Sequence, residues 1–163
     1  MSIGYAVSRA FQKKMERGWE KWPRMFWAID LHDVIIPGTY TKNNIDKLLY
    51  PGALQVLRWL TRREDMCMIL WTASHGEPLG EIIDWLQGQG IDFDYCGENP
   101  DCESNELCCF DHKFYFDVLL EDKAGFVGLT DWSEIRQTLE SIGEWEKEIS
   151  HALLPGEEWR KDG

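Results

Sequence analysis

Two short apolar runs constrain the fold of this chain more than any other feature. They read MFWAI at residues 25–29 and MCMILW at residues 66–71. Neither run alternates apolar with polar residues, so each suits a strand that is covered on both faces, as strands in parallel sheets are. Residues 91–95 and 114–120 predict two further strands.

Segments with helical spacing of apolar residues separate these strands, and they cover residues 5–20, 52–60, 78–88 and 131–142. Pro51-Gly52 opens the second segment, and Pro78 fits the first turn of the third. Asp131 and Glu134 predict a capping box for the last helix. The alternation of strands and helices predicts an α/β fold, a Rossmann-like three-layer sandwich around a central parallel sheet.

A chain of 163 residues predicts one compact domain. We divide it into an N-terminal helical extension at residues 1–24, the α/β domain at 25–142 and a charged C-terminal tail at 143–163. No apolar run approaches the roughly 20 residues that cross a bilayer, and the N-terminus lacks a secretory apolar region. These features predict a cytoplasmic protein without a membrane partner.

The charge is unevenly distributed along the chain. The net charge is −12, although residues 1–24 carry six basic side chains against two acidic ones. The acidic remainder disfavours nucleic acid, while the basic helix weakly favours it. A solvated helix on an acidic body is the preferred interpretation, and a nucleic-acid partner stays an unsupported alternative.

Five cysteines in a chain with no export signal predict reduced thiols. A zinc site is the alternative, because four cysteines and a histidine fall within one loop at residues 96–112: Cys96, Cys102, Cys108, Cys109 and His112. Their spacing lacks the usual C-x2-C pair, so we favour the thiols.

Polar side chains stand directly after three of the predicted strands. Asp30, Thr72 and Asp122 each follow a strand end. The carboxyl ends of parallel strands share one edge, where ligands of α/β proteins bind. Carboxylates, a hydroxyl and a lysine at one edge suit Mg²⁺-assisted phosphoryl transfer, in which oxygen ligands hold the metal.

Four segments in order, each placed after or near a suitable strand, carry a resemblance to a known family. They are IDLHDVI at residues 29–35, ILWTAS at residues 69–74, Lys113, and LLEDKAG at residues 119–125. Over residues 25–126 the chain resembles the haloacid dehalogenase superfamily of Rossmann-like phosphatases and phosphotransferases. Neither residues 31–50 nor 96–112 hold a full cap domain, so the resemblance implies an open site.

The resemblance implies a magnesium site and a nucleophile. Asp30 would be both the nucleophile and a metal ligand, and the backbone carbonyl of His32 would be a second ligand. Asp122 would bind Mg²⁺, with Glu121 beside it as a direct or water-mediated ligand.

The resemblance also implies how substrate is held. Thr72, with Ala73 beside it, would bind the transferring phosphoryl group. Lys113 would neutralise charge on the nucleophile and the phosphate. His75, Tyr40 and Lys42 are the nearest candidates for contact with the leaving group.

The chain departs from the family at residue 32, where phosphatases usually carry a second aspartate that acts as acid and base. An imidazole titrates near neutral pH, so His32 is a candidate replacement. Asp33 does not replace it simply, because an adjacent residue points elsewhere on an extended backbone.

The sequence therefore predicts a Mg²⁺-dependent phosphomonoesterase that forms an aspartyl-phosphate. A nucleotide or polynucleotide phosphatase is a refinement of this prediction. The alternative is a catalytically degenerate relative that binds phosphate or a protein partner.

Overall fold

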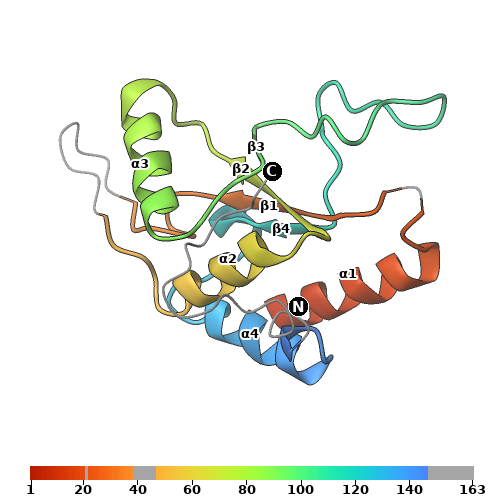
Figure 1. The fold of residues 1–163 in the computed structure, drawn as a ribbon, viewed down its shortest axis with the longest axis horizontal. Helices are drawn as coiled ribbons and strands as arrows, with labels where there is room; N and C mark the ends of the chain where they lie inside the picture. The colour runs from red at the N-terminus through yellow and green to blue at the C-terminus, as the bar shows by residue number, and fades with distance from the viewer. Residues whose placement is uncertain (21, 39–46, 147–163) are drawn as a thin grey trace.

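The computed structural model describes residues 1–20, 22–38 and 47–146. Its centre is an all-parallel sheet of four strands in the order β3-β2-β1-β4 (Figure 1). The strands are β1 (Met25–Asp30), β2 (Met66–Trp71), β3 (Tyr95–Cys96) and β4 (Val118–Leu120). The predicted α/β class with a central parallel sheet is confirmed.

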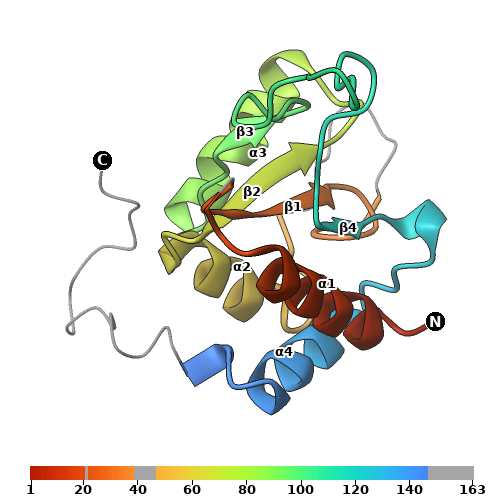
Figure 2. The same cartoon turned by 90° about the vertical axis from the view of Figure 1, so that its right-hand side faces the viewer.

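The helices gather on one face of this sheet. They are α1 (Ile3–Arg17), α2 (Ala53–Arg62), α3 (Gly76–Gly88) and α4 (Asp131–Ser141), with a 3-10 turn η1 (Asp122–Ala124) after β4. Figure 2 shows α1, α2 and α4 on one side of the sheet and the chain between β3 and β4 on the other. The fold therefore has three layers, and the third consists of irregular chain. None of the helices in the described ranges is long and apolar enough to cross a membrane.

The sheet separates two apolar clusters. Met25, Trp27 and Ile29 of β1 belong to the large core beneath the helices. Phe26 and Ala28 belong to a smaller cluster that includes side chains of the irregular layer. Because successive residues of a strand face opposite sides, a strand covered on both faces must be apolar throughout, as the sequence of β1 is.

Helix α1 is part of the main core and does not stand apart from it. Val7, Ala10 and Phe11 are buried in the same cluster as the sheet. Lys14 is also buried, and its ammonium donates hydrogen bonds to the carbonyls of Trp22 and Arg24, the latter at 2.8 Å. One basic side chain of this region therefore fastens the connection between α1 and β1, and it is not available to a surface partner.

The third strand is shorter than predicted, because β3 contains only Tyr95–Cys96 rather than 91–95. Asp94 explains the difference. Its amide donates to the carbonyl of Met68 at 2.9 Å, and its carboxylate accepts from the amide of Met68 at 2.8 Å. A side-chain oxygen thus takes the place of a backbone carbonyl where the ladder would continue.

The fourth strand is shortened in the same way. It begins at Val118, and residues 114–117 are not paired as strand. The amide of Asp117 donates to the carbonyl of Phe26 at 2.8 Å, and the carboxylate of Asp117 accepts from the amide of Phe26 at 2.9 Å. Each outer strand is therefore preceded by an aspartate that binds both polar groups of one residue on its neighbour.

Two predicted helix ends are also wrong. Helix α1 spans Ile3–Arg17 rather than 5–20, with Ser2 as its N-cap. Helix α4 has no capping box: Thr130 is its N-cap, and the Glu134 carboxylate instead accepts from the amide of Gly4 at 2.9 Å. That contact joins the starts of α1 and α4, and long-range packing therefore overrides the local motif.

Trp132 ties α4 to the segment after β1. Its side chain is fully buried, and its indole N–H donates to the carbonyl of Val34 at 2.7 Å.

We expect Trp132→Phe to lower the free energy of unfolding by about 1–3 kcal/mol, because the carbonyl of Val34 loses its donor in a dry site. Urea unfolding measures this. The matched change Trp71→Phe, at a residue that is 42% exposed, should stay within about 0.5 kcal/mol, and an equal loss in both variants would contradict the prediction.

Candidate active site

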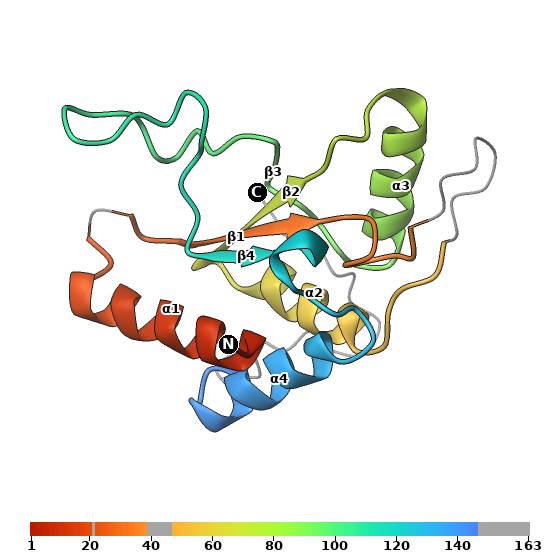
Figure 3. The ribbon, with the colours of Figure 1, turned by 180° about the vertical axis from the view of Figure 1, so that it is seen from behind.

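The register of the sheet brings three distant segments to one edge. Asp30 is the last residue of β1 and pairs with Trp71, the last residue of β2. Ile29 pairs with Leu120, so Glu121 and Asp122 follow β4 at the level where β1 ends. Figure 3 shows β1 and β4 running in the same direction, with the turn after β4 beside the end of β1.

Three carboxylates form a cluster at this edge. Oxygen atoms of Asp30, Glu121 and Asp122 lie within 4.8 Å of one another. The pKa of Asp30 is raised to about 6, chiefly by burial and also by the charges of Glu121 and Asp122, while the hydrogen bond from the amide of Leu31 opposes the rise. A half-buried group of oxygen ligands that repel one another is a donor set that fits a hard divalent cation such as Mg²⁺.

Asp122 differs from Asp30 in its environment. Desolvation acts to raise its pKa, but hydrogen bonding to Glu121 and Asp30 and the ammonium of Lys123 together outweigh it, so the pKa is lowered. The Nζ atom of Lys123 lies 3.5 Å from the Asp122 carboxylate. Sequence reasoning gave Lys123 no role, although it lies within the fourth motif.

A hydrogen-bonded chain connects the segments after β1 and β2. The Nε2 atom of His32 lies 3.1 Å from the hydroxyl oxygen of Ser74. The amide of Ser74 donates to the hydroxyl oxygen of Thr72, also at 3.1 Å. The structure thus joins His32 to the residue predicted to bind the phosphoryl group. Sequence analysis assigned Ser74 no part in the site, because only the fold reveals which side chain meets the imidazole.

Asp33 is committed to the loop that follows β1. Its backbone has a φ of 60°, in the left-handed region that a non-glycine residue seldom adopts. Its carboxylate accepts from the amide of Gly38 at 2.8 Å and from the hydroxyl of Tyr50 at 3.5 Å. The carboxylate therefore holds the turn together and does not join the cluster around Asp30, as the sequence argument expected.

Lys113 and Ala73 occupy different places relative to the cluster. Ala73 follows Thr72 and is exposed. Lys113 is exposed in the segment before β4, with its ammonium 6.0 Å from the centre of the Phe116 ring. Within the described part of the chain it has no hydrogen bond or ion pair with Asp30 or Asp122. Its proposed charge-neutralising role remains a prediction, as does metal binding by the His32 carbonyl.

Of the three leaving-group candidates, His75 is exposed next to α3, while Tyr40 and Lys42 lie outside the described residues.

The cysteine loop does not assemble a metal site among residues 1–20, 22–38 and 47–146. Within those ranges the carboxylate cluster alone brings three suitable ligands together. All five cysteines are described, and no disulfide joins any two of them. Burial raises the pKa of the Cys102 thiol to about 11, which keeps it protonated and a poor metal ligand. The reduced thiols are the favoured interpretation.

Comparison with known proteins gives a fold relative without a stated function. No protein-family model matches the chain, and no curated protein is similar to it. A solved structure described as a conserved protein from Bacteroides thetaiotaomicron is similar, with a TM-score of 0.56 and 27% identity. The match covers 73% of this chain and 92% of that one. The comparison supports the α/β architecture. It gives no function, so any chemistry must be inferred from the residues of the site.

The carboxylate cluster predicts opposite effects of one substitution with and without metal. At pH 8, where Asp30 is ionised, Asp30→Asn should stabilise the metal-free protein by roughly 1 kcal/mol, because it removes repulsion from Glu121 and Asp122. The same change should abolish stabilisation by Mg²⁺, which for the unsubstituted protein reaches about 2.7 kcal/mol at a hundred times Kd.

Thermal unfolding in EDTA and across a Mg²⁺ titration measures both effects. Glu106→Gln removes one exposed carboxylate from the loop at residues 96–112 and should behave as the unsubstituted protein does. Equal stabilisation of Asp30→Asn and the unsubstituted protein by Mg²⁺ would argue against a metal at this edge.

Proposed function

We propose that this chain is a Mg²⁺-dependent phosphomonoesterase of the haloacid dehalogenase type, with Asp30 as the nucleophile. The observation that carries the proposal is the meeting of three carboxylates from the ends of β1 and β4. The hydrogen-bonded chain from His32 to Thr72 at the same edge supports it, because it supplies polar groups suited to a phosphoryl oxygen and a leaving group.

The residues that would hold the metal are Asp30, Asp122, Glu121 and the backbone carbonyl of His32. Bound Mg²⁺ would supply positive charge that offsets the charge of the phosphoryl oxygens. Carboxylate and carbonyl oxygens are the donors that this hard cation prefers.

Asp30 performs the covalent chemistry in this proposal. A carboxylate oxygen of Asp30 attacks phosphorus, and the bond between phosphorus and the ester oxygen breaks. The product is an aspartyl-phosphate and a free alcohol. Water then attacks phosphorus, the bond to Asp30 breaks, and inorganic phosphate leaves with the carboxylate regenerated.

His32 moves the protons in both steps. As imidazolium it donates a proton to the ester oxygen when the alcohol leaves, and as imidazole it accepts a proton from the attacking water. The contact with Ser74 helps to hold the ring in one orientation. In this proposal Thr72 donates to a phosphoryl oxygen; its hydroxyl oxygen accepts from the amide of Ser74, which leaves the hydroxyl hydrogen for that bond.

A second candidate function is phosphate binding, or partner binding, without turnover. The replacement of the second aspartate by His32 favours it, because the usual acid and base of the family is absent from that position. The two candidates differ in one measurable respect: only the first releases inorganic phosphate. A nucleotide or polynucleotide substrate would be a refinement of the first.

Asp30→Asn should decrease kcat for a generic aryl phosphate by at least about a thousandfold, because an amide does not attack phosphorus. Phosphate release with Mg²⁺ and with EDTA measures the loss, and Glu106→Gln is the matched control that should retain turnover. If the unsubstituted protein releases no phosphate from any ester of a broad panel, phosphate or partner binding without turnover becomes the better proposal.

His32→Ala should lower kcat by about a hundredfold or more, the usual contribution of a general acid–base. Ser74→Ala should lower kcat less, about tenfold, while the KM of the substrate stays nearly constant, because Ser74 orients the ring and does not bind substrate. Steady-state kinetics on purified variants separates the two effects. A larger loss in Ser74→Ala than in His32→Ala would contradict the assigned roles.

A further inference from the structure

A cavity lies between the end of β2 and the irregular layer, and its lining includes Trp71, the residue that pairs with Asp30 in the sheet. Its volume is about 510 Å³, large enough for a small organic group. We call it the loop cavity. The lining residues used below are Trp71, Glu98, Asn99, Ser104, Asp111 and Phe114.

The register of the sheet places Asp30 and the loop cavity on the same face. The paired residues Phe26 and Cys67 both belong to the smaller apolar cluster on that face. Two and four residues further along, the pairs are Ala28 with Ile69 and then Asp30 with Trp71. Side chains of a strand repeat their direction every second residue, so Asp30 and Trp71 face the irregular layer together. A substrate held at Asp30 can therefore extend its leaving group along this face toward Trp71 and the cavity.

The chemistry of the cavity is aromatic and acidic. The indole of Trp71 is partly exposed, and its ring centre lies 5.2 Å from that of Phe114. Glu98 and Asp111 contribute carboxylates that form no hydrogen bond or ion pair with any other described residue. No lysine or arginine is among the described residues that line it. His112 is the one basic side chain among the described lining residues, so two carboxylates face a single imidazole, and an aromatic surface next to them attracts a cation.

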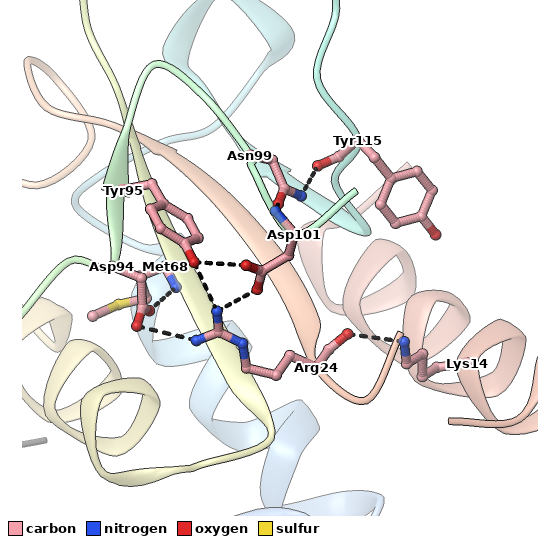
Figure 4. Close-up of polar contacts among 8 residues, drawn as sticks. All are labelled: Lys14, Arg24, Met68, Asp94, Tyr95, Asn99, Asp101 and Tyr115. Atoms are coloured by element: carbon pink, nitrogen blue, oxygen red, sulfur yellow. Dashed lines mark hydrogen bonds and ion pairs between the residues drawn. The ribbon is translucent and has the colours of Figure 1, made fainter. Parts of the chain in front are cut away.

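Polar contacts hold the segment that includes Asn99, one of the lining residues (Figure 4). The Arg24 guanidinium donates to the Asp94 carboxylate at 3.2 Å and to the Tyr95 hydroxyl at 3.2 Å, and it forms an ion pair with Asp101. This network fastens the start of the irregular layer to β1 and β3.

Two further contacts continue this support into the lining itself. Asn99 donates to the carbonyl of Tyr115 at 2.8 Å and accepts from the amide of Asp101 at 3.2 Å (Figure 4). The Ser104 hydroxyl oxygen accepts from the amide of Phe110 at 2.8 Å. A cavity whose backbone is already tied down loses little conformational entropy when a ligand enters.

We propose that the loop cavity binds the leaving group of the substrate and selects phosphomonoesters whose leaving group carries a positively charged amine. The inference rests on the proposed phosphomonoesterase activity. The ammonium lies over Trp71 and between the carboxylates of Glu98 and Asp111. A leaving group that carries a carboxylate or a further phosphate meets repulsion there, so nucleoside polyphosphates and polynucleotides are disfavoured.

Turnover tests the selection with three aryl phosphates: 4-(aminomethyl)phenyl, 4-methylphenyl and 4-carboxyphenyl phosphate. We expect kcat/KM to be about tenfold higher for the ammonium ester than for the methyl ester, and lowest for the carboxylate ester. In the double variant Glu98→Gln/Asp111→Asn that ratio should fall about tenfold. The three esters differ in intrinsic reactivity, but this difference is the same for every protein. Comparing the ratio of kcat/KM for the ammonium and methyl esters between the unsubstituted protein and the variant therefore removes it. Glu106→Gln, in the same loop but outside the cavity lining, should leave the ratio unchanged.

Binding without chemistry separates failure of this inference from failure of the proposed function. The probes are 4-(aminomethyl)phenol and 4-methylphenol, each titrated into metal-free protein. Binding is followed by the change in tryptophan fluorescence, and the part of that change that is absent in Trp71→Phe is assigned to Trp71. Binding of the amine at least tenfold tighter than the neutral phenol, lost in the double variant, supports the inference even if no ester is hydrolysed. Equal affinity for the two probes, or no saturable shift with the amine, overturns it even if phosphatase activity is present.

Discussion

Parallel hydrogen bonding between β1 and its two neighbours is the constraint on which the site depends. All six residues of β1 pair in register with β2, and three of them pair with β4. A slip of one residue would turn every side chain to the opposite face and move Asp30 away from the irregular layer. Asp94 and Asp117 oppose such a slip, because the carboxylate of each accepts from the amide of one residue on the adjacent strand while its own amide donates to the carbonyl of that residue.

The same geometry concentrates negative charge where the strands end. Asp30 is half-buried at the end of an otherwise apolar strand, and Glu121 and Asp122 come close to it. Burial is the main cause of the raised pKa of Asp30, and the charges of Glu121 and Asp122 add to it. Burial of the apolar strands thus stabilises the fold, while repulsion between the carboxylates just beyond the strand ends destabilises it. This combination is common where a binding or catalytic site lies at the edge of a well-packed sheet.

The sequence predicted most accurately those elements whose pattern is determined by burial alone. Burial on both faces leaves an unmistakable apolar run, so β1 was predicted to within one residue and β2 at its observed bounds. The convergence of Asp30 with Asp122 followed from parallel topology. The outer strands were overestimated, because a carboxylate at Asp94 or Asp117 replaces backbone pairing and no local pattern reveals this. The contact between His32 and Ser74 depends on how two loops meet, which no single segment encodes.

The pairing of β4 with β1 joins strands that lie far apart in the sequence. Phe26 and Asp117 are 91 residues apart, and their mutual hydrogen bonds mark the point where β4 joins β1. Such a contact requires closure of a long loop, which is entropically unfavourable until many other contacts exist. The helices and β1–β2 can form through contacts nearer in the chain. The carboxylate cluster therefore requires this long-range closure, and a chain interrupted before β4 lacks Glu121 and Asp122 together with the part of the core that β4 and α4 supply.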